Sequence, residues 1–406
     1  MIAMGERAVT TRGARLLSVA ASDLDGHIAR VRALPWRGGV GRLIGDVQAA
    51  GLTGRGGAGE PTWRKLATVA TTERPVVVAN AAESEPASAK DVTLLSRCPH
   101  LVLDGLQLAV ETVGATAVYL YVRPGPAARI ARAALAERAA RRWDLFPVRV
   151  VEAEESFAAG EEATVLARTT GRRTRPTRSV LRRGRTMGRP GPPDRATLVQ
   201  NVETLAHLAQ IAYHGPAWFR RLGTAAEPGT FLMTVSGMVA RPGVYEVPVG
   251  IAGSALLDLA GPADDPVAAV LLGGFHGTWL PTATIAGRPL SRAGLEPLGA
   301  RPGAGVLVAA SAAQCGLAET AAIVHYLAAQ RRPHCGPCRA GLPEIAARMT
   351  ELAHGRGPDS HRLAGLVAGH GACRHLDGAA NLVRSALDTF ATEVRRHHGG
   401  ECSCPG

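Results

Sequence analysis

The chain has 406 residues and a formal net charge of +12, and this length predicts two to four domains with buried cores. The charge favours an acidic partner or a polyanion, but there is no zinc-finger or aromatic–basic RNA motif, so we expect no nucleic-acid partner. The first 15 residues lack the apolar run of a signal peptide, and no stretch of about 20 residues is free of polar side chains, so we expect a cytoplasmic protein without a membrane span.

A glycine-rich stretch at 51–59 follows a short amphipathic helix predicted over 42–50. Five of its nine residues are glycine, which permits positive φ and lets a ligand approach the backbone closely. N–H groups that lead into a helix N-terminus form a cradle for phosphate, and Lys65 adds a point charge beside it. A flexible loop without a ligand is the alternative interpretation. Lys65 and Lys90 are the two lysines of the chain, and the other cationic side chains are arginine.

Strands and helices then alternate along the chain. Apolar runs predict strands over 75–80, 117–122 and 148–151, with helices over 100–114 and 127–142 between them. This alternation predicts an α/β layer with a mainly parallel sheet.

Polar residues follow the first of these strands at 80–86, and ligands bind at the carboxyl ends of strands in open α/β sheets. Gly160-Glu161-Glu162 opens a helix, where carboxylates suit the positive helix N-terminus; a surface pair that only satisfies the dipole is the alternative. The segment 171–195 carries nine arginines and predicts a solvated basic loop. Asn201 then starts a helix that runs to about 213.

The sequence changes character after residue 228. Strands are predicted over 231–237, 243–249 and 268–272, with a short helix over 254–260. We therefore expect a small α+β module near 228–300.

The last third predicts a small helical bundle, because apolar residues recur there with a helical period. The expected helices are 317–330, 342–354, 361–368 and 382–395. Six of the seven cysteines lie beyond residue 314, and in a cytosolic chain such a cluster favours a metal site over disulfides.

The order of these motifs resembles the NADH-binding, flavin-containing subunit of respiratory complex I. That family includes flavoprotein subunits of NAD-reducing hydrogenases and NAD-dependent formate dehydrogenases. Residues 51–62 resemble the family's flavin loop, Gly-Leu-Arg-Gly-Arg-Gly-Gly-Ala-Gly-Phe-Pro-Thr, and 80–86 resemble its Asn-Ala-Asp-Glu-Gly-Glu-Pro. Residues 160–162 match its Gly-Glu-Glu, and 201–205 match its Asn-Val-Glu-Thr-Leu. The resemblance covers roughly residues 40–395.

The resemblance implies a Rossmann-like FMN-binding α/β domain, a small β-grasp (SLBB-like) domain and a helical iron–sulfur domain. The corresponding division of the chain is an N-terminal leader at 1–35, the FMN domain at 36–227, the β-grasp domain at 228–300, the iron–sulfur domain at 301–396 and a disordered tail at 397–406.

The resemblance also implies the site residues. The FMN phosphate would be held by Gly54, Arg55, Gly56, Gly57, Ala58, Gly59 and Lys65. The ribityl chain and ring would be surrounded by Asn80, Glu83, Gly160, Glu161 and Asn201, with Thr204 as a further cofactor-binding residue. The catalytic carboxylates on the nicotinamide side would be Glu85 and Glu162. The iron–sulfur ligands would be Cys335, Cys338 and Cys373.

The implied reaction is hydride transfer from NAD(P)H to FMN. Single electrons would then pass to an iron–sulfur cluster and out to a carrier, since a flavin accepts two electrons and releases them one at a time. The carrier would be a ferredoxin, a thioredoxin-like 2Fe–2S subunit or a quinone-linked carrier, and a complex I-like assembly is one setting for it.

Several positions depart from the family pattern. In the family, two aromatic residues stack on the adenine side of NADH, and this chain has Glu60 and Thr68 at those positions. The family's Lys-Pro-Pro-Phe-Pro segment is lost within 171–195. We therefore do not expect the usual mode of NADH binding. The replacements Ala82, Ser84 and Gln200 soften the flavin site without abolishing it.

The iron–sulfur motif departs as well, because its first cysteine is Arg332. His334 or an exogenous ligand can complete a four-iron cluster (4Fe–4S), a three-iron cluster (3Fe–4S) can form, or the cysteines can be a relic or a zinc site. Cys315 and the tail pair Cys402 and Cys404 can in principle contribute. These losses motivate an alternative function, a degenerate non-catalytic homologue that binds or scaffolds a redox partner.

Overall fold

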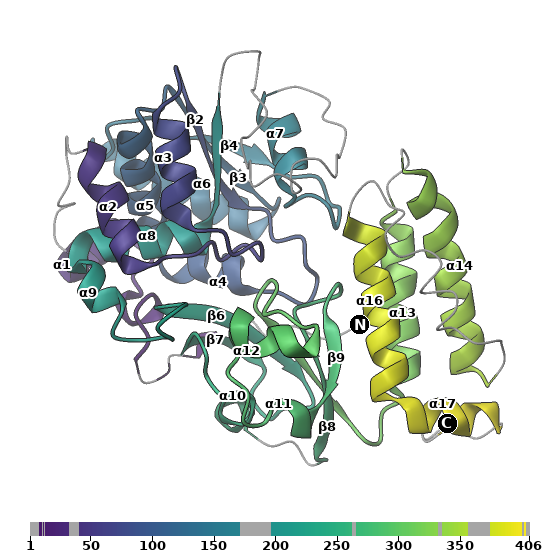
Figure 1. Cartoon of the computed structure of the whole chain (residues 1–406). Helices are drawn as coiled ribbons and strands as arrows, with labels where there is room; N and C mark the ends of the chain where they lie inside the picture. Colours follow the sequence, from purple (N-terminus) through teal and green to yellow (C-terminus); the bar gives the residue numbers. More distant parts are fainter. Residues whose placement is uncertain are drawn as a thin grey trace.

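The first part of the chain folds around a parallel four-stranded sheet, shown in the computed structural model of Figure 1. Its order is β4-β3-β2-β5, and all neighbours are parallel. The strands are β2 (Val76–Ala81), β3 (Ala117–Val122), β4 (Arg149–Glu152) and β5 (Thr197–Asn201). The structure describes residues 8–9, 11, 13–31, 40–170, 196–261, 265–331, 335–355, 374–399 and 402.

Helices cover both faces of this sheet. They are α2 (Val40–Ala50), α3 (Thr62–Ala70), α4 (Lys90–Arg97), α5 (Pro99–Val113), α6 (Pro126–Ala140), α7 (Glu162–Thr170), α8 (Val202–His214) and α9 (Pro216–Phe219). Val77 packs with α5 and α8 on one face, whereas Val78 packs with α7 on the other, as the two-residue period of a strand requires. A Cβ on Gly105 of α5 would lie 1.9 Å from the Leu205 carbonyl oxygen of α8, so only glycine permits this close approach.

The N-terminal segment is fastened to the second part of the chain. It forms β1 (Ala8–Val9), the 3-10 helix η1 (Leu17–Val19) and α1 (Leu24–Val31), and β1 pairs with a strand of the second sheet. The buried carboxylate of Glu246 accepts hydrogen bonds from the backbone N–H groups of Arg15, Leu16 and Leu17. The predicted leader therefore has a structural role that the sequence did not reveal.

The second sheet has six strands in the order β1-β7-β6-β10-β8-β9. Its further strands are β6 (Thr230–Gly237), β7 (Gly243–Pro248), β8 (Val267–Leu272), β9 (Thr278–Pro281) and β10 (Val306–Ser311). The short helices beside it are α10 (Gly253–Ala260), α11 (Thr282–Ile285), α12 (Arg292–Leu295) and the 3-10 helix η3 (Glu296–Leu298). Strand β10 lies in the middle of this sheet, between β6 and β8, although the sequence assigned its residues to the helical part.

The second sheet contacts both other parts of the chain. Leu232 of β6 belongs to the core of the α/β part, whereas Val306 and Val308 of β10 pack against the helical bundle. The intervening Leu307 faces α10 and α11 on the opposite side. The sheet is thus buried on both faces and connects the two parts that carry the predicted cofactors.

The C-terminal bundle consists of α13 (Gly316–Ala329), α14 (Gly336–Ala353), α16 (Arg374–Thr389) and α17 (Ala391–His398). The prediction of a helix over 317–330 agrees with α13. Helix α14 begins earlier than the predicted 342, because Pro337 occupies the first turn, where proline is tolerated. The single helix predicted over 382–395 is instead two helices that meet near Phe390. The predicted helix at 361–368 lies outside the described residues.

The predicted tail begins later than 397, since His397 and His398 are the last two residues of α17. No helix in the described part of the chain has the length and apolar character that a membrane span requires.

Candidate functional site

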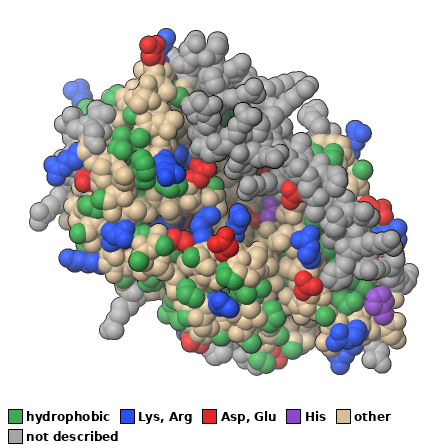
Figure 2. All heavy atoms as spheres, in the orientation of Figure 1, with side chains coloured by type: hydrophobic (Ala, Val, Ile, Leu, Met, Phe, Trp, Pro, Cys, Tyr) green, Lys and Arg blue, Asp and Glu red, His purple; other side chains and the backbone are tan. Residues whose placement is uncertain are grey.

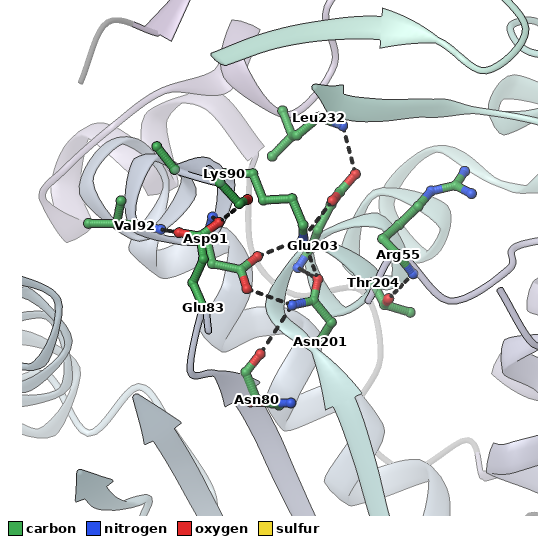
Figure 3. Close-up of polar contacts among 12 residues, drawn as sticks. Arg55, Asn80, Glu83, Lys90, Asp91, Val92, Asn201, Glu203, Thr204 and Leu232 are labelled. Carbon is green, nitrogen blue, oxygen red and sulfur yellow. Dashed lines mark hydrogen bonds and ion pairs between the residues drawn. The ribbon is translucent and has the colours of Figure 1, made fainter. Parts of the chain in front are cut away.

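Three motifs that are far apart in the sequence meet at the carboxyl edge of the parallel sheet, and Figure 3 shows two of them, at Asn80 and Asn201. Asn80, near the end of β2, donates its side-chain N–H to the Gly160 carbonyl oxygen over 2.9 Å. Asn201, the last residue of β5, donates to the Asn80 carbonyl oxygen over 3.2 Å. Because β2 and β5 are parallel neighbours, their ends place Asn80 beside Asn201, and Gly160, in the segment between β4 and α7, lies against the Asn80 side chain.

The glycine loop packs against the start of α8. It is closed by a bridge between Thr53 and Pro61 and by a hydrogen bond from the Gly54 N–H to the Glu60 carbonyl oxygen. The Arg55 N–H donates to the Thr204 hydroxyl over 2.8 Å. The N–H groups of Gly54 and Arg55, which we predicted to hold phosphate, are therefore used inside the protein. Thr204 acts on the loop in this structure, and its contact with a cofactor remains a prediction.

The rest of the loop leaves backbone donors available. Among the described residues, no group accepts a hydrogen bond from the N–H of Gly56, Gly57, Ala58 or Gly59. Gly57 and Gly59 adopt φ values of 95° and 64°, which favour glycine. Four consecutive backbone donors of this kind fit an anionic phosphate, and their contact with the FMN phosphate remains a prediction.

Lys65 and Glu162 lie opposite one another beside this loop. Lys65 is on the first turns of α3, Glu162 is the first residue of α7, and their Nζ and Oε2 atoms are 3.5 Å apart. Glu161 precedes α7, and its carbonyl oxygen accepts hydrogen bonds from Thr164 and Val165. The structure thus brings Lys65 and the Gly-Glu-Glu motif together across the sheet edge.

The loop also contacts the second module through Arg292 of α12. The Arg292 guanidinium donates to the Gly57 carbonyl oxygen over 2.6 Å, and a Cβ on Gly59 would lie 2.0 Å from the same guanidinium. A small pocket opens at this seam. It is lined by Thr53, Gly54, Arg55, Gly57, Glu203, Glu227, Phe231, Leu232, Val249, Arg292, Pro302, Gly303 and Gly305. Figure 2 shows charged side chains gathered near the centre of this face, where the α/β part meets the second sheet. No motif in the sequence pointed to Arg292.

A buried charged network holds Asn201 in place (Figure 3). The Nζ atom of Lys90 lies 2.7 Å from an Asp91 oxygen, 3.0 Å from a Glu203 oxygen and 2.9 Å from the Asn201 side-chain oxygen. Burial would lower the pKa of Lys90, but the carboxylates of Asp91 and Glu203 outweigh it and raise that pKa. Lys90 therefore stays charged and is fully engaged within the protein. Sequence reasoning missed Glu203, although it lies inside the Asn-Val-Glu-Thr motif.

Glu83 caps the N-terminus of α4. Its carboxylate accepts hydrogen bonds from the N–H groups of Asp91 and Val92, over 3.1 and 3.4 Å, and from the Ser88 hydroxyl. Burial, reinforced by the charge of Asp91, raises the pKa of Glu83 to about 7. These hydrogen bonds give Glu83 a structural role as the cap of α4, and the contact of Glu83 with a flavin remains a prediction.

Glu85 reaches into the second module. Its carboxylate accepts hydrogen bonds from the Phe275 N–H over 3.0 Å and from the Ala87 N–H over 3.3 Å. Burial raises the pKa of Glu85 to about 7. This carboxylate joins the α/β part to the loop after β8, and its predicted place on the nicotinamide side remains a prediction.

The predicted iron–sulfur ligands begin at the N-terminus of α14. Cys335 is the N-cap residue and Cys338 lies in the first turn, and both are buried in the apolar core of the bundle. Cys373, Arg332 and His334 lie outside the described residues. Of the three predicted ligands, two therefore lie in the described part of the chain, one turn apart, and a four-iron cluster normally takes four cysteines.

Comparisons with known proteins identify the family. The Nuo51 FMN-binding domain model matches residues 47–210, and the NADH-ubiquinone oxidoreductase-F iron-sulfur binding region model matches residues 318–397. The F subunit of NADH-quinone oxidoreductase from Mycobacterium bovis is 32% identical over 393 residues, which cover 89% of this chain and 85% of that protein. The F 2 subunit of the same enzyme from Rhizobium meliloti is 30% identical over 385 residues, which cover 87% of this chain and 88% of that protein. The chain belongs to the family of NADH-quinone oxidoreductase F subunits.

A solved structure supports the same placement. An NAD+-reducing [NiFe]-hydrogenase in the H2-reduced state matches with a TM-score of 0.76 and 28% identity over 87% of this chain. The match spans 62% of the length of that hydrogenase chain. These likenesses confirm the predicted fold class, with a parallel α/β sheet and a helical C-terminal region.

Family membership also confirms the broader function. The chain is an NADH dehydrogenase-like electron-transfer oxidoreductase subunit with an FMN-binding domain and an iron–sulfur region. Within this member of the family, the positions of the two adenine-side aromatics carry no ring. The carbonyl oxygen of Glu60 closes the glycine loop, and the hydroxyl of Thr68 donates to the Arg64 carbonyl oxygen on the exposed side of α3. The segment 171–195 lies outside the described residues.

Proposed function

We propose that this protein binds FMN across the carboxyl edge of the parallel sheet and receives electrons there from a reduced donor, NAD(P)H or another. The observation that carries the proposal is the set of four N–H groups at 56–59 for which no described residue supplies an acceptor, placed beside the buried Lys90–Asn201 network. When bound, FMN supplies the chemistry, because it takes up two electrons and releases them singly.

Different residues of the chain would bind different parts of FMN. The amides of 56–59 and the Lys65 ammonium would hold the phosphate, whose negative charge would draw Lys65 away from Glu162. Asn80, whose side chain donates to the Gly160 carbonyl oxygen, and Asn201, whose side chain donates to the Asn80 carbonyl oxygen, would orient the polar part of the cofactor. Glu162 would then be released at a partly exposed position, where its side chain is 32% exposed and can face an incoming donor.

The donor would bind in a mode that does not use ring stacking on the adenine. Glu60 and Thr68 occupy the positions of the family's aromatics, and a carboxylate in that place repels the phosphates of a dinucleotide. We therefore expect slower reduction by NADH than a typical member of the family shows, whichever donor proves physiological.

The electron acceptor would be an acidic iron–sulfur protein, either a ferredoxin or a thioredoxin-like 2Fe–2S subunit. The net charge of +12 supports this, because opposite charges steer the encounter of two proteins. A cytoplasmic location is part of the same proposal. Several relatives are themselves subunits of larger enzymes, such as the NADP-reducing hydrogenase subunit HndC of Solidesulfovibrio fructosivorans, which is 28% identical over 380 residues.

A second candidate is a non-catalytic homologue that docks a redox partner. The absence of a ring at positions 60 and 68 and of a cysteine at position 332 favours this alternative. It differs from the first proposal in one measurable property, because it requires no bound flavin.

The first experiment is the visible spectrum and the FMN content of the full chain purified anaerobically. We expect a yellow protein with close to one FMN per chain. Lys65→Ala should weaken FMN binding about tenfold or more, since a charge-assisted hydrogen bond to phosphate contributes about 1.5–3 kcal/mol. Arg64→Ala is the matched control, because Arg64 is exposed on the same helix. A colourless protein that takes up no added FMN would contradict the first proposal and leave the second candidate.

The second experiment identifies the donor. Stopped-flow mixing of the flavin-loaded protein with NADH and with NADPH should show bleaching of the flavin band. If neither nucleotide bleaches it while dithionite does, the donor is not a nicotinamide nucleotide.

A further inference from the structure

Four potential metal ligands gather at the end of the bundle formed by α17. They are Cys315, Glu393, His397 and Cys402, and their ligand atoms all lie within 4.8 Å of one another. They come from three separate pieces of chain: the junction of β10 and α13, helix α17, and the residues that follow α17. Neither the family motifs nor the flavin site use them.

One distance within the group matches that expected at a zinc centre. The Cys315 Sγ and His397 Nε2 atoms are 3.6 Å apart, and a zinc ion with ordinary bond lengths would place a sulfur and a nitrogen ligand about 3.6 Å apart. The Glu393 Oε1 atom lies 2.9 Å from the same His397 nitrogen. Glu393 and His397 are four residues apart on α17, so they share one face of the helix.

The surroundings orient these ligands toward one point. The second ring nitrogen of His397, Nδ1, lies 3.0 Å from the Leu352 carbonyl oxygen, as is usual for metal-binding histidines, and a metal at Nε2 would replace the contact of that atom with Glu393. Cys315 is the N-cap residue of α13, and its sulfur accepts a hydrogen bond from the Ala318 N–H. The positive end of a helix favours the thiolate form that a metal requires.

This group is distinct from the iron–sulfur region. Leu352 lies in the last turn of α14, whereas Cys335 and Cys338 lie at its start. At 1.5 Å of rise per residue, the length of α14 separates the two places by about 24 Å.

We propose that Cys315, Glu393, His397 and Cys402 form a structural zinc site. Two thiolates, one imidazole and one carboxylate are a donor set that suits Zn²⁺ rather than Mg²⁺ or Ca²⁺. Binding releases the thiol protons of Cys315 and Cys402 to solvent. With four protein ligands the centre has no open position, so its role is structural rather than catalytic.

The site ties the end of the chain to the base of the bundle. Residue 402 is exposed and lies beyond the last helix, whereas Cys315 and His397 are buried. Zinc would hold the C-terminal residues against the junction of β10 and α13, through which the second sheet connects to the bundle.

The test is the zinc and iron content of the full chain, measured in the same sample by mass spectrometry of the elements. After chelation and titration with Zn²⁺ alone, the wild-type protein should retain about one zinc per chain, and its binding should release the protons of its thiols. Cys402→Ser and His397→Ala should lose this zinc while the iron content stays the same. Cobalt in place of zinc should give the absorption bands of a tetrahedral thiolate site.

Two matched controls keep the result specific. His398→Ala alters the neighbouring, exposed histidine, and Cys404→Ser alters the other tail cysteine; both should retain zinc. Because Cys402 is exposed, its substitution leaves the core unchanged, and circular dichroism checks the fold. Wild-type protein that takes up no zinc, a Cys402→Ser variant that retains it, or a Cys315–Cys402 disulfide in the purified protein would each overturn the proposal.

Discussion

The carboxyl edge of the parallel sheet and the first turn of α14 differ in the kind of ligand that they offer. The sheet edge presents backbone N–H groups at 56–59, in a loop that the Thr204 hydroxyl fastens by accepting the Arg55 N–H. The turn of α14 presents thiols, Cys335 and Cys338, and each is a side chain that one mutation can remove. The first region matches its family pattern through most of the glycine loop, whereas the second has lost a cysteine at Arg332.

This difference shows how a binding site resists changes in sequence. A backbone donor survives any substitution that leaves the loop conformation intact, so the loop tolerates Glu60 in place of an aromatic. A thiolate has no substitute in the backbone, and the loss of one position changes the ligand count directly. Substitutions can show whether the sheet edge needs the buried charged network for its stability, and whether the absence of a cysteine at position 332 limits the iron content of the bundle.

The largest expected effect concerns the support of the sheet edge. Lys90→Met would leave the carboxylates of Asp91 and Glu203 buried without their cation, which costs about 3–5 kcal/mol of unfolding free energy. Urea unfolding of the FMN-free protein measures this loss. Arg97→Met, at an exposed position of the same helix, should change stability by less than about 0.5 kcal/mol. Equal effects of the two substitutions would show that the network is not needed.

The next effect concerns the backbone donors themselves. A Cβ on Gly56 would lie 3.2 Å from the Asn201 Cβ atom, so Gly56→Val should push the loop away from α8 and cover its amides. We expect FMN binding at least about 100-fold weaker, or about 2.7 kcal/mol, as measured by quenching of flavin fluorescence. Gly45→Val is the control, since a Cβ there meets no atom within 4 Å. Full FMN affinity in the Gly56→Val variant would show that this loop does not bind the FMN phosphate.

A third prediction concerns the bundle. Arg332→Cys restores the fourth cysteine of the family pattern, so the iron content after anaerobic reconstitution should rise to about four per chain. Arg331→Cys adds a thiol one residue away and should leave the iron content unchanged. If the two variants carry equal iron, the missing thiol does not limit the cluster.

The smallest effect concerns the link between the α/β part and the second sheet. Because burial raises the pKa of Glu85 from 4.5 to about 7, the folded protein keeps a proton that the unfolded chain loses within this range. Unfolding free energy therefore falls as pH rises from about 4.5 to 7 and stays lower above it. Glu85→Gln should remove this fall and gain about 1–2 kcal/mol at pH 8, a value reduced for partial exposure.

The measurement is denaturant unfolding of the FMN-free protein at pH 5 and pH 8. The exposed Glu155→Gln should keep the wild-type pH dependence. An unchanged slope in Glu85→Gln would assign that pH dependence to other groups, such as Glu83.

Much of the α/β part could be predicted, because its signals are local. The run Val76–Val78 indicated a buried strand that ends at polar residues, whereas the grouping of Asn80 with Asn201 was implied only by the family resemblance. Strand β5 was missed because Thr197–Asn201 adjoins an arginine-rich segment and leads directly into a helix. Strand β10 was missed because its apolar residues run on toward α13 without a clear boundary.

The contacts between parts could not be predicted from local patterns. Arg292 contacts Gly57 from 235 residues away, and Glu85 accepts the Phe275 N–H from 190 residues away. Nothing in the sequence near either residue specifies its partner, because the partner is set by how the second sheet packs on the first part. The retained Lys90 was a usable signal, yet its buried partner Glu203 emerged only from the fold.

The carboxylate of Glu246 has a consequence for how the chain acquires its structure during synthesis. The acceptor of the Arg15 N–H lies 231 residues further along the chain, and the partner strand of β1 is β7. The N-terminal residues leave the ribosome first, but they can form these contacts only after the second sheet has been synthesised. The long intervening loop must close before the contacts can form. In a fragment that stops at residue 227, Arg15 would lack its acceptor Glu246 and β1 would lack its partner strand β7.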